Sequence, residues 1–445
     1  MAVILDTAYQ ALSWSPYLLL AACILRCVIL LRKQPFPANA PKFVSGYPMV
    51  GALQFFFDRE KFFRDNIETS PTKSASFYLG RSRVVGLSGP QGRKTFFESL
   101  DLDLDQGAEL FIPFVSSLER SDDPSAEMHD SHMRTSLRGL LLRTHSLEFV
   151  PAAMHACTAA TWDLIAAKGL IDPFQEVAWL YTQSTMAALG LDEVARSPAL
   201  SRKLSGLVSA MDGFFSAADM VVPWLLNPFH IPVAIAAGRL YVMLWQIVRR
   251  RKRQQQQQQV GRGDHKKEGL LQQLIDKGSS MRAISKATSP GVACWLLMGL
   301  ATNAGWMARV RQEVDQVVTK HRKHGQSAEQ VLQALDLYTW EHEFPIIEAC
   351  LLESVRLSAG LVTFRKNISS RDVPIGDTGK VIPPGAYVTY SGEEVQMDPT
   401  IYPDPQRWDP GRFLPEGNGH WKEPMMFVGF GAGRKTCCEF AASLH

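Results

Sequence analysis

A glycine-containing loop that ends in a cysteine, near the end of the chain, restricts the possible folds most strongly. The loop spans residues 430–437 and reads FGAGRKTC. Gly431 and Gly433 allow the backbone to approach a bulky, flat ligand closely, and Phe430 is suited to pack on that ligand. A single thiolate facing a planar cofactor is typical of a haem axial ligand, because sulfur donates electron density to the iron. We therefore expect Cys437 to be the metal ligand and haem to be the cofactor.

The composition excludes several classes of protein. The 445 residues include 47 Lys and Arg against 44 Asp and Glu, which gives a net charge of +3. A nucleic-acid-binding protein would carry a clear basic excess, so we expect no nucleic-acid partner. Seven cysteines are too few for a disulfide scaffold in a chain of this length, and a reducing, cytosol-facing environment is expected.

An apolar segment near the N-terminus predicts a membrane anchor. Residues 17–31 contain Arg26 as their only charged residue. A transmembrane helix needs about 20 mostly apolar residues, so the segment suffices if Arg26 lies near an interface. Arg32 and Lys33 follow directly, and by the positive-inside rule they leave the bulk of the chain in the cytosol. A cleaved signal peptide is the alternative interpretation.

Three regions follow from this pattern: an anchor at 1–33, a proline-rich hinge at 34–50 and a globular body at 51–445. Because proline stiffens the backbone, the hinge is expected to be a semi-rigid spacer between membrane and body. In the body we expect an early hairpin formed by residues 77–79 and 83–87. A long helical part should follow at 91–260, and a second β-rich part at 373–390.

One internal segment, residues 214–248, is also strongly apolar. Asp219, Arg239 and three prolines interrupt it, and such residues are costly inside a bilayer. We therefore expect two helices and a loop. They are either ordinary core helices or a loop that dips into the membrane surface and admits apolar substrates.

Two further motifs precede the cysteine loop. Glu353 and Arg356 are three residues apart in a helical pattern, so they lie on one face of a helix and are close enough to pair. The segment 408–413 reads WDPGRF and is proline-rich. We expect Arg412 in this segment to complete a buried ionic cluster with Glu353, because the planar fork of an arginine fixes the geometry of such a cluster.

In this order and at these separations, the three motifs resemble the cytochrome P450 superfamily of haem-thiolate monooxygenases. The Glu-x-x-Arg, Trp-x-Pro-x-Arg-Phe and Phe-Gly-x-Gly-x-x-x-Cys motifs match residues 353–356, 408–413 and 430–437. The resemblance covers nearly the whole chain and is closest to membrane-bound eukaryotic members. It implies a mainly α fold with small β-sheets (α+β), in which residues 51–445 form the monooxygenase domain. The implied reaction inserts one oxygen atom from dioxygen into an apolar small molecule, such as a sterol, a lipid or a secondary metabolite.

The resemblance also implies partners for the cofactor and for electron transfer. Arg365 is implied to bind a haem propionate, with a solvent-facing strand arginine as the alternative, and Arg134 or Arg138 is the candidate for the other propionate. Electrons are expected from an NADPH-dependent flavoprotein reductase in the endoplasmic reticulum membrane. The cations expected to form a docking surface for that reductase are Lys422, Arg434 and Lys435. Surface cations without a role are the alternative.

The sequence departs from the family pattern in two places. After Cys437 come Cys438 and Glu439 where the family has Cys-x-Gly, and the last residue is His445, so the expected fold lacks part of its C-terminal end. Cys438 is the alternative metal ligand. The central helix of the family is also expected to lack a part, because too few residues separate Asp276 from the region of α-helical pattern that follows it.

The acid–alcohol pair that the family carries on its central helix is missing, and Thr288 is the remaining candidate for the catalytic hydroxyl. A helix cap or a plain polar residue is the alternative role. The sequence around Thr288 resembles that of the branch containing sterol 7α-hydroxylases and prostacyclin synthase. A peroxide-rearranging isomerase is therefore the second hypothesis. The third is a truncated, non-catalytic remnant, because the two missing parts indicate an incomplete gene product.

Overall fold

The computed structural model describes most of the chain after the N-terminal segment. The described residues are 32–110, 150–188, 191–212, 220–221, 230–258, 291–358, 362–417, 419–433 and 436. The chain divides into two compact units. The first comprises Met1–Pro113, Ser216–Leu225 and Thr363–Ser391, and the second comprises Phe114–Phe215, Leu226–Val362 and Gly392–His445.

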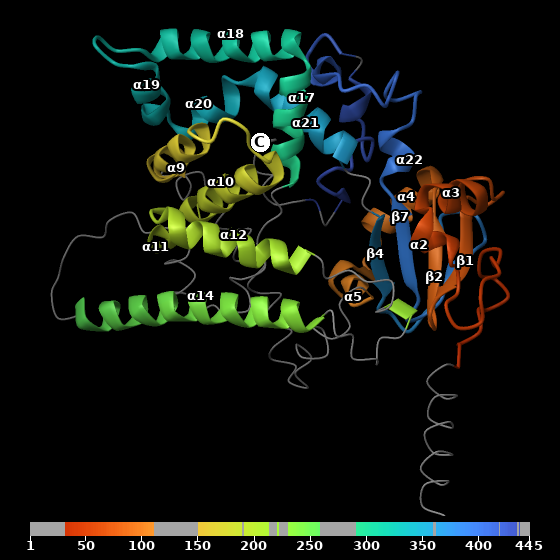
Figure 1. The fold of residues 1–445 in the computed structure, drawn as a ribbon. Coiled ribbons are helices and arrows are strands. Elements are labelled where there is room, and N and C mark those ends of the chain that lie inside the picture. The colour runs from red at the N-terminus through yellow and green to blue at the C-terminus, as the bar shows by residue number, and fades with distance from the viewer. Residues whose placement is uncertain are drawn as a thin grey trace, which may run out of the picture. The chain divides into compact units, whose positions relative to one another are not determined.

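The first unit is built on a mixed β-sheet. Among the described residues this sheet has the strand order β1-β2-β7-β4-β3. The strands are β1 (Ser74–Leu79), β2 (Ser82–Leu87), β3 (Leu102–Asp103), β4 (Val362–Asn367) and β7 (Tyr387–Ser391). In Figure 1 the late strands β7 and β4, in blue, lie beside the early strands β1 and β2, in orange. The sheet therefore joins two parts of the chain that are about three hundred residues apart in sequence.

The register of the sheet explains the early hairpin. Strands β1 and β2 are antiparallel, with Ser74 opposite Leu87, and β2 runs parallel to β7 with Val84 opposite Tyr387. Gly80, at the turn, has φ of 58°, a left-handed conformation that glycine adopts without steric cost. The predicted hairpin is thus confirmed, and each strand is longer than the sequence pattern indicated. A second, two-stranded sheet pairs β5 (Val373–Pro374) with β6 (Val381–Ile382).

The first unit also contains short helices. They are α2 (Gln54–Phe57), α3 (Arg59–Phe63), the π-helix η1 (Arg64–Glu68), α4 (Gly89–Glu98) and α5 (Leu104–Ala108). Three of them, α2, α3 and α4, contribute phenylalanines. Phe55 contacts the rings of Phe62, Phe77 and Phe364, and the ring centroids are 5.7, 5.7 and 6.0 Å away. Phe55, Phe62 and Phe77 are fully buried, so aromatic packing holds the helices on the sheet.

The proline-rich segment after residue 33 lies along the first strand. The Val44 N–H donates to the Ser76 carbonyl, and the Ser76 N–H donates to the Lys42 carbonyl, at 2.8 and 2.9 Å. The rings of Phe36 and Phe43 pack on Tyr78. This segment is therefore tied to the first unit by backbone bonds and ring contacts, and its role as a spacer from a membrane stays a prediction.

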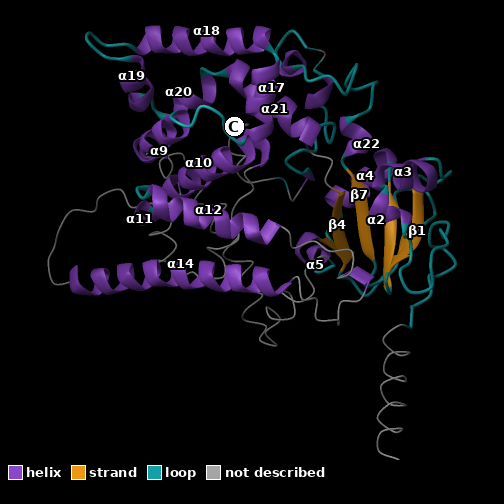
Figure 2. Ribbon diagram, in the orientation of Figure 1, coloured by secondary structure: helices purple, strands orange, loops and turns teal. Residues whose placement is uncertain are grey.

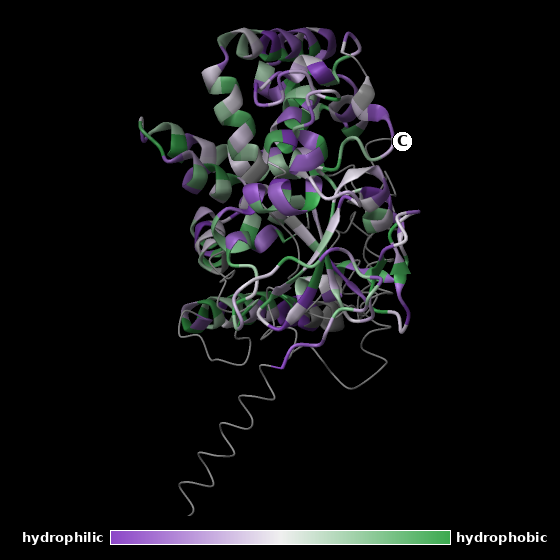
Figure 3. Ribbon diagram, turned by 90° about the vertical axis from the view of Figure 1, so that its right-hand side faces the viewer, coloured by the Kyte–Doolittle hydropathy of each residue, from purple (hydrophilic) through white to green (hydrophobic). Residues whose placement is uncertain are grey.

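The second unit is helical. Its helices are α9 (Val150–Ala166), α10 (Pro173–Ala188), α11 (Asp192–Ala195), α12 (Pro198–Asp212), α14 (His230–Gln258), α17 (Gly291–Thr302), α18 (Ala304–His321), α19 (Ala328–Ala334), α20 (Leu337–His342), α21 (Pro345–Ser358), α22 (Glu393–Gln396), η2 (Pro410–Phe413) and η3 (His420–Lys422). Figure 2 shows this unit as helices joined by loops. In Figure 3 hydrophobic and hydrophilic residues alternate along the helices, as the packing of amphipathic helices requires. The predicted mainly α fold with small β-sheets is confirmed.

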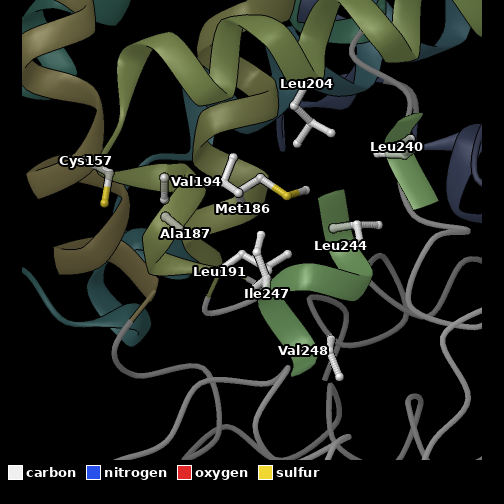
Figure 4. Packing of buried hydrophobic residues seen from close by; sticks show 11 residues of the cluster. Cys157, Met186, Ala187, Leu191, Val194, Leu204, Leu240, Leu244, Ile247 and Val248 are labelled. Atoms are coloured by element: carbon white, nitrogen blue, oxygen red, sulfur yellow. The ribbon is translucent and has the colours of Figure 1, made fainter. Parts of the chain in front are cut away.

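One hydrophobic cluster joins α9, α10, α11, α12 and α14. Its buried members are Cys157, Met186, Ala187, Leu191, Val194, Ala195, Leu204, Leu240, Leu244, Ile247 and Val248. Figure 4 shows Met186 and Leu191 pointing toward Leu244 and Ile247 of α14. The buried Gln183 side chain of α10 donates hydrogen bonds to the carbonyls of Cys157 in α9 and Ala195 in α11.

Helix α14 covers the second half of the apolar segment 214–248. His230–Arg251 is the one stretch, among the residues that the structure describes, that is long and apolar enough to cross a membrane by length and composition. One face of α14 is buried in the cluster above, which agrees with the expectation of a core helix. The predicted partner helix and loop fall at 213–219 and 222–229, outside the described residues.

Candidate functional site

The centre of the candidate site is a buried ion pair on α21. The Arg356 guanidinium donates from Nε to Oε2 and from Nη2 to Oε1 of Glu353, and both bonds are 2.8 Å long. Both side chains have no exposed surface. Two planar, charge-assisted hydrogen bonds of this kind fix the orientation of both groups.

Arg356 also connects α21 to the end of α22 and to the segment that follows it. Its Nη1 donates to the Gln396 carbonyl and its Nη2 donates to the Pro405 carbonyl, both at 2.7 Å. The guanidinium lies 5.0 Å from the centre of the Tyr402 ring. A buried arginine is stable only when its N–H groups are paired, and these carbonyls complete that pairing.

Arg412 is the third charged member of this cluster. Its Nε lies 3.4 Å from Glu353 Oε1, close enough for an ion pair. The Arg412 guanidinium also donates to the carbonyls of Pro403 and Asp404. The predicted three-member cluster of Glu353, Arg356 and Arg412 is therefore confirmed.

Two hydrogen bonds that the motifs did not reveal hold the segment 408–413 on α21. The Asp409 N–H donates to Glu353 Oε1 at 2.9 Å, and Trp408 Nε1 donates to Ser354 Oγ at 3.1 Å. The Trp408 ring also leaves no room beside Gly299 of α17, where an added Cβ would lie 2.5 Å from the ring. The tryptophan of the second motif and the serine after Glu353 were the signals that could have indicated the Trp408–Ser354 bond.

A carboxylate from α18 stabilises the start of α21. Glu313 of α18 accepts hydrogen bonds from the N–H groups of Ile346 and Ile347, at 2.7 and 3.1 Å. These N–H groups have no partner within their own helix, so a carboxylate there stabilises its N-terminus. Burial raises the pKa of Glu313, although these two hydrogen bonds and Arg309 oppose that shift.

The described part of the cysteine loop lies against α21 and the residues after it. Gly431 and Gly433 have φ of 74° and 62°, which glycine adopts readily, and the Gly431 N–H donates to the Val428 carbonyl at 2.9 Å. Phe430 packs on Phe427, with ring centroids 6.1 Å apart. The loop thus presents glycine backbone and an aromatic side chain together, as a flat cofactor requires.

A hydrophobic cluster packs against this loop and includes its aromatic residues. Its buried members are Ala349, Leu352, Tyr402 and Phe413, and its partly buried members are Ile401, Leu414, Trp421, Phe427 and Phe430. The Tyr402 hydroxyl donates to the Met426 carbonyl at 2.9 Å. Apolar packing and the Tyr402–Met426 hydrogen bond therefore hold the segment that leads into the loop.

Arg365 lies in the first unit, in the middle of β4. It is 3% exposed, so the alternative of a solvent-facing strand arginine is wrong. Its guanidinium lies 4.8 Å from the centre of the Phe96 ring, and Nη1 donates to the Phe97 carbonyl at 3.4 Å. Its Nε is buried and has no hydrogen-bond partner within the described part of the chain. Burial lowers the pKa of Arg365 to about 10, and the charge of Asp103 opposes that shift.

The remaining predicted site residues lie outside the described residues. They are Thr288, Cys437, the alternative ligand Cys438, the candidate propionate partners Arg134 and Arg138, and the surface cations Arg434 and Lys435. The third surface cation, Lys422, is exposed, and its Nζ lies 5.5 Å from the centre of the Trp421 ring. The structure brings together Glu353, Arg356 and Arg412.

Sequence comparisons agree with this geometry. The Cytochrome P450 family model matches residues 281–438, which include the buried ion cluster and the cysteine loop. Cytochrome P450 monooxygenase AacuE of Aspergillus aculeatus is 27% identical over 419 residues, which cover 90% of this chain and 82% of the relative. Cytochrome P450 monooxygenase dmxR5 of a Cryptosporiopsis species is 27% identical over 422 residues, with 90% and 80% covered. Over most of its length the chain is similar to cytochrome P450 monooxygenases.

The fold comparison agrees with these relatives. The solved structure of a retinoic acid bound cyanobacterial CYP120A1 matches this chain with a TM-score of 0.64 and 18% identity. The match covers 91% of this chain and 89% of the other. The cytochrome P450 fold is therefore confirmed. The predicted likeness to the branch of sterol 7α-hydroxylases and prostacyclin synthase stays a prediction.

Two observations test whether the chain fits a haem. The Arg365 guanidinium is buried and its Nε has no partner among the described residues, and a buried cation of this kind is suited to an anionic group such as a propionate. The loop offers left-handed glycines at 431 and 433 beside a partly buried Phe430. Both features fit a flat, apolar cofactor with carboxylates.

Proposed function

We propose that this chain is a haem-thiolate monooxygenase that inserts one oxygen atom from dioxygen into an apolar small molecule. A sterol, a lipid or a secondary metabolite fits this class. The observation that supports the proposal most strongly is the buried Glu353–Arg356 pair, which also holds Asp409 and lies next to Arg412. This cluster immobilises the chain segment that leads into the cysteine loop.

Residues of the loop and of β4 hold the cofactor in this proposal. Cys437 binds the iron through its sulfur, Phe430 packs on the porphyrin, and Gly431 and Gly433 let the backbone approach it. Arg365 donates to a propionate, which gives its unpartnered Nε an acceptor. When bound, a thiolate-ligated haem supplies the iron at which dioxygen is activated.

Thr288 is proposed as the hydroxyl on the oxygen side of the haem. A hydroxyl both donates and accepts a hydrogen bond, so Thr288 would pass on a proton at its Oγ without keeping a charge. The proposal rests on the sequence pattern around Thr288 and on the match of residues 281–438 to the Cytochrome P450 family model.

Electrons are proposed to come from NADPH through a flavoprotein reductase. The exposed Lys422 supports a positive docking surface, to which Arg434 and Lys435 of the sequence add two charges. Opposite charges on two partners speed their encounter and fix their relative orientation, so an acidic reductase surface is the expected complement.

The chain is proposed to be bound to the endoplasmic reticulum membrane, with its body in the cytosol. The apolar residues 17–31, followed by Arg32 and Lys33, support an anchor with that orientation. Helix α14 supports a second contact, because Ile231, Ile235, Val242 and Trp245 are exposed along one stripe. Their spacing of about one and two helical turns places them on the side of α14 opposite its buried face.

The test is oxidation by the purified full-length chain in detergent. With NADPH, a microsomal flavoprotein reductase and labelled dioxygen, we expect one labelled oxygen atom per product molecule from an apolar substrate panel. The boiled enzyme and the Cys437→Ala variant are controls.

The same assay separates the three functional hypotheses. Turnover of a lipid hydroperoxide without reductase or NADPH, with no reductase-dependent product, would instead indicate the peroxide-rearranging isomerase. A chain that binds haem at less than a stoichiometric amount and turns over neither class would indicate a non-catalytic protein.

A further inference from the structure

Gln396, the last residue of α22, has a buried side chain. The residue has no exposed surface, and among the described residues neither Nε2 nor Oε1 has a hydrogen-bond partner. The great majority of buried amides in proteins are hydrogen-bonded, so an amide with both ends unpaired requires an explanation. Leucine or methionine would fill the same space without this cost.

The backbone of Gln396 is held firmly while its side chain is not. Its carbonyl accepts the 2.7 Å hydrogen bond from Arg356 Nη1, and its N–H donates to the Gly392 carbonyl at 3.1 Å. Arg356 is in turn held by the carboxylate of Glu353. The buried ion cluster therefore fixes the backbone position from which the Gln396 side chain extends.

The side chain extends toward the cysteine loop. A Cβ added to Gly429 would lie 3.5 Å from Gln396 Nε2, and 2.3 Å from Cγ1 of Val355 on α21. The loop backbone at Gly429 thus passes directly beside the amide, and no side chain at position 429 separates them. Backbone N–H and C=O groups are the natural partners of an amide.

We propose that Gln396 is a positioning residue for the haem-ligand loop, and that its amide hydrogen-bonds to the backbone of residues 428–433 when haem is bound. The inference rests on the proposed haem site. In this proposal the amide gains its partners only when haem is bound. The bonds connect the Glu353–Arg356 pair to the loop that ends in Cys437, and they oppose movement of that loop away from the iron.

The test compares Gln396→Met with the wild-type chain, both full length and in detergent, with and without haem. Methionine has nearly the shape of glutamine and forms no amide hydrogen bonds. We expect the Gln396→Met apoprotein to melt at the wild-type temperature or above it, because the wild-type amide has no partner there. With haem bound, we expect the variant to lose haem to apomyoglobin about fivefold to thirtyfold faster, as one or two lost hydrogen bonds imply.

Two further measurements separate positioning from plain structural support. Amide hydrogen exchange of residues 428–433 should slow on haem binding in the wild type and slow less in Gln396→Met. The fraction of reduced, carbon-monoxide-bound protein that keeps the thiolate-type absorption band should also fall in the variant.

Gln183→Met is the matched control, because it removes a buried amide that already donates two hydrogen bonds in the helical core. That variant should destabilise the apoprotein and the haem protein equally. Equal haem loss by wild type and Gln396→Met, or equal destabilisation of both forms by Gln396→Met, would overturn the proposal. A wild-type chain that binds no thiolate-ligated haem would instead contradict the proposed function.

Discussion

Arg356 donates one 2.8 Å hydrogen bond to each carboxylate oxygen of Glu353, and neither side chain has exposed surface. The same guanidinium donates to carbonyls 40 and 49 residues farther along the chain. One side chain therefore holds α21, the end of α22 and the segment around Pro405 in a fixed arrangement. The cysteine loop packs against this part of the fold, through Phe427 and Phe430.

We expect Arg356→Met to destabilise the fold by about 3–5 kcal/mol, because it leaves the Glu353 carboxylate buried without its partner. Arg356→Lys should not restore stability, since an ammonium cannot replace the planar fork that donates to Glu353 and two carbonyls. The measurement is the free energy of unfolding in urea. Arg196→Gln, in an exposed pair with Asp192, is the control and should cost about 0–1 kcal/mol. A loss as small as this for Arg356→Met would contradict the account.

A second prediction concerns the charge on Arg365. Burial lowers its pKa to about 10 from 12.5, so the charged form is less favourable in the folded apoprotein than in the unfolded chain. The charged Arg365 therefore lowers the free energy of unfolding of the apoprotein below pH 10, and this destabilisation is lost as the pH rises above that value.

Arg365→Met should therefore leave the melting temperature of the apoprotein unchanged or raise it. The same variant should bind haem about tenfold more weakly, because a propionate loses a charge-assisted hydrogen bond. Haem titration by absorbance and thermal melting of the apoprotein measure the two effects. Unchanged haem affinity together with a less stable apoprotein would indicate a structural arginine with no role in cofactor binding.

The third prediction is a pH dependence of stability that comes from Glu313. Burial raises the pKa of this carboxyl above its ordinary value of 4.5, so the folded chain holds the proton to higher pH than the unfolded chain. Stability from this group is therefore fully present below pH 4.5 and decreases as the pH rises through the folded pKa. The charged or polar groups that act on it are Arg309 and the N–H groups of Ile346 and Ile347.

The measurement is the urea midpoint of wild type and Glu313→Gln from acid to neutral pH. We expect the wild type to lose stability relative to the variant as the pH rises, because glutamine does not ionise. A difference between the two chains that stays constant over this range would show that Glu313 has an ordinary pKa. Glu329→Gln, on an exposed side chain, is the control.

The fourth prediction concerns Cys350 on α21. Burial raises the pKa of its thiol to about 12 from 9.0, so the thiolate fraction near neutral pH falls about a thousandfold. Iodoacetamide should therefore not label Cys350 in the folded chain, and it should label the residue rapidly in urea. Mass spectrometry of the tryptic peptides gives the result. Labelling of Cys350 in the folded chain at the rate seen in urea would contradict its burial.

Sequence reasoning predicted the parts of the site that depend on short spacing. The three-residue interval between Glu353 and Arg356 determines a helical face, and the planar fork of Arg412 suited it to the same carboxylate. The early hairpin followed from two β-like runs around Gly80. These features are local in sequence, or they need one long-range contact between charged groups.

Features that depend on the packing of distant segments could not be predicted. Strand β4 (Val362–Asn367) contains Arg365 and Lys366, which interrupt the apolar alternation by which strands are recognised. Burial of Arg365 arises from Phe96 and Phe97, which lie more than two hundred and sixty residues earlier. Gln396 gave no signal, because it ends a four-residue helix in a polar stretch.

The most direct test of the central claim is the absorption spectrum of the reduced, carbon-monoxide-bound chain, recorded for wild type, Cys437→Ala and Cys438→Ala. We predict a stoichiometric thiolate-ligated haem spectrum for wild type and for Cys438→Ala, and its loss in Cys437→Ala. A wild-type chain that stays colourless when expressed with a haem precursor would contradict the account, and so would a thiolate spectrum that survives Cys437→Ala.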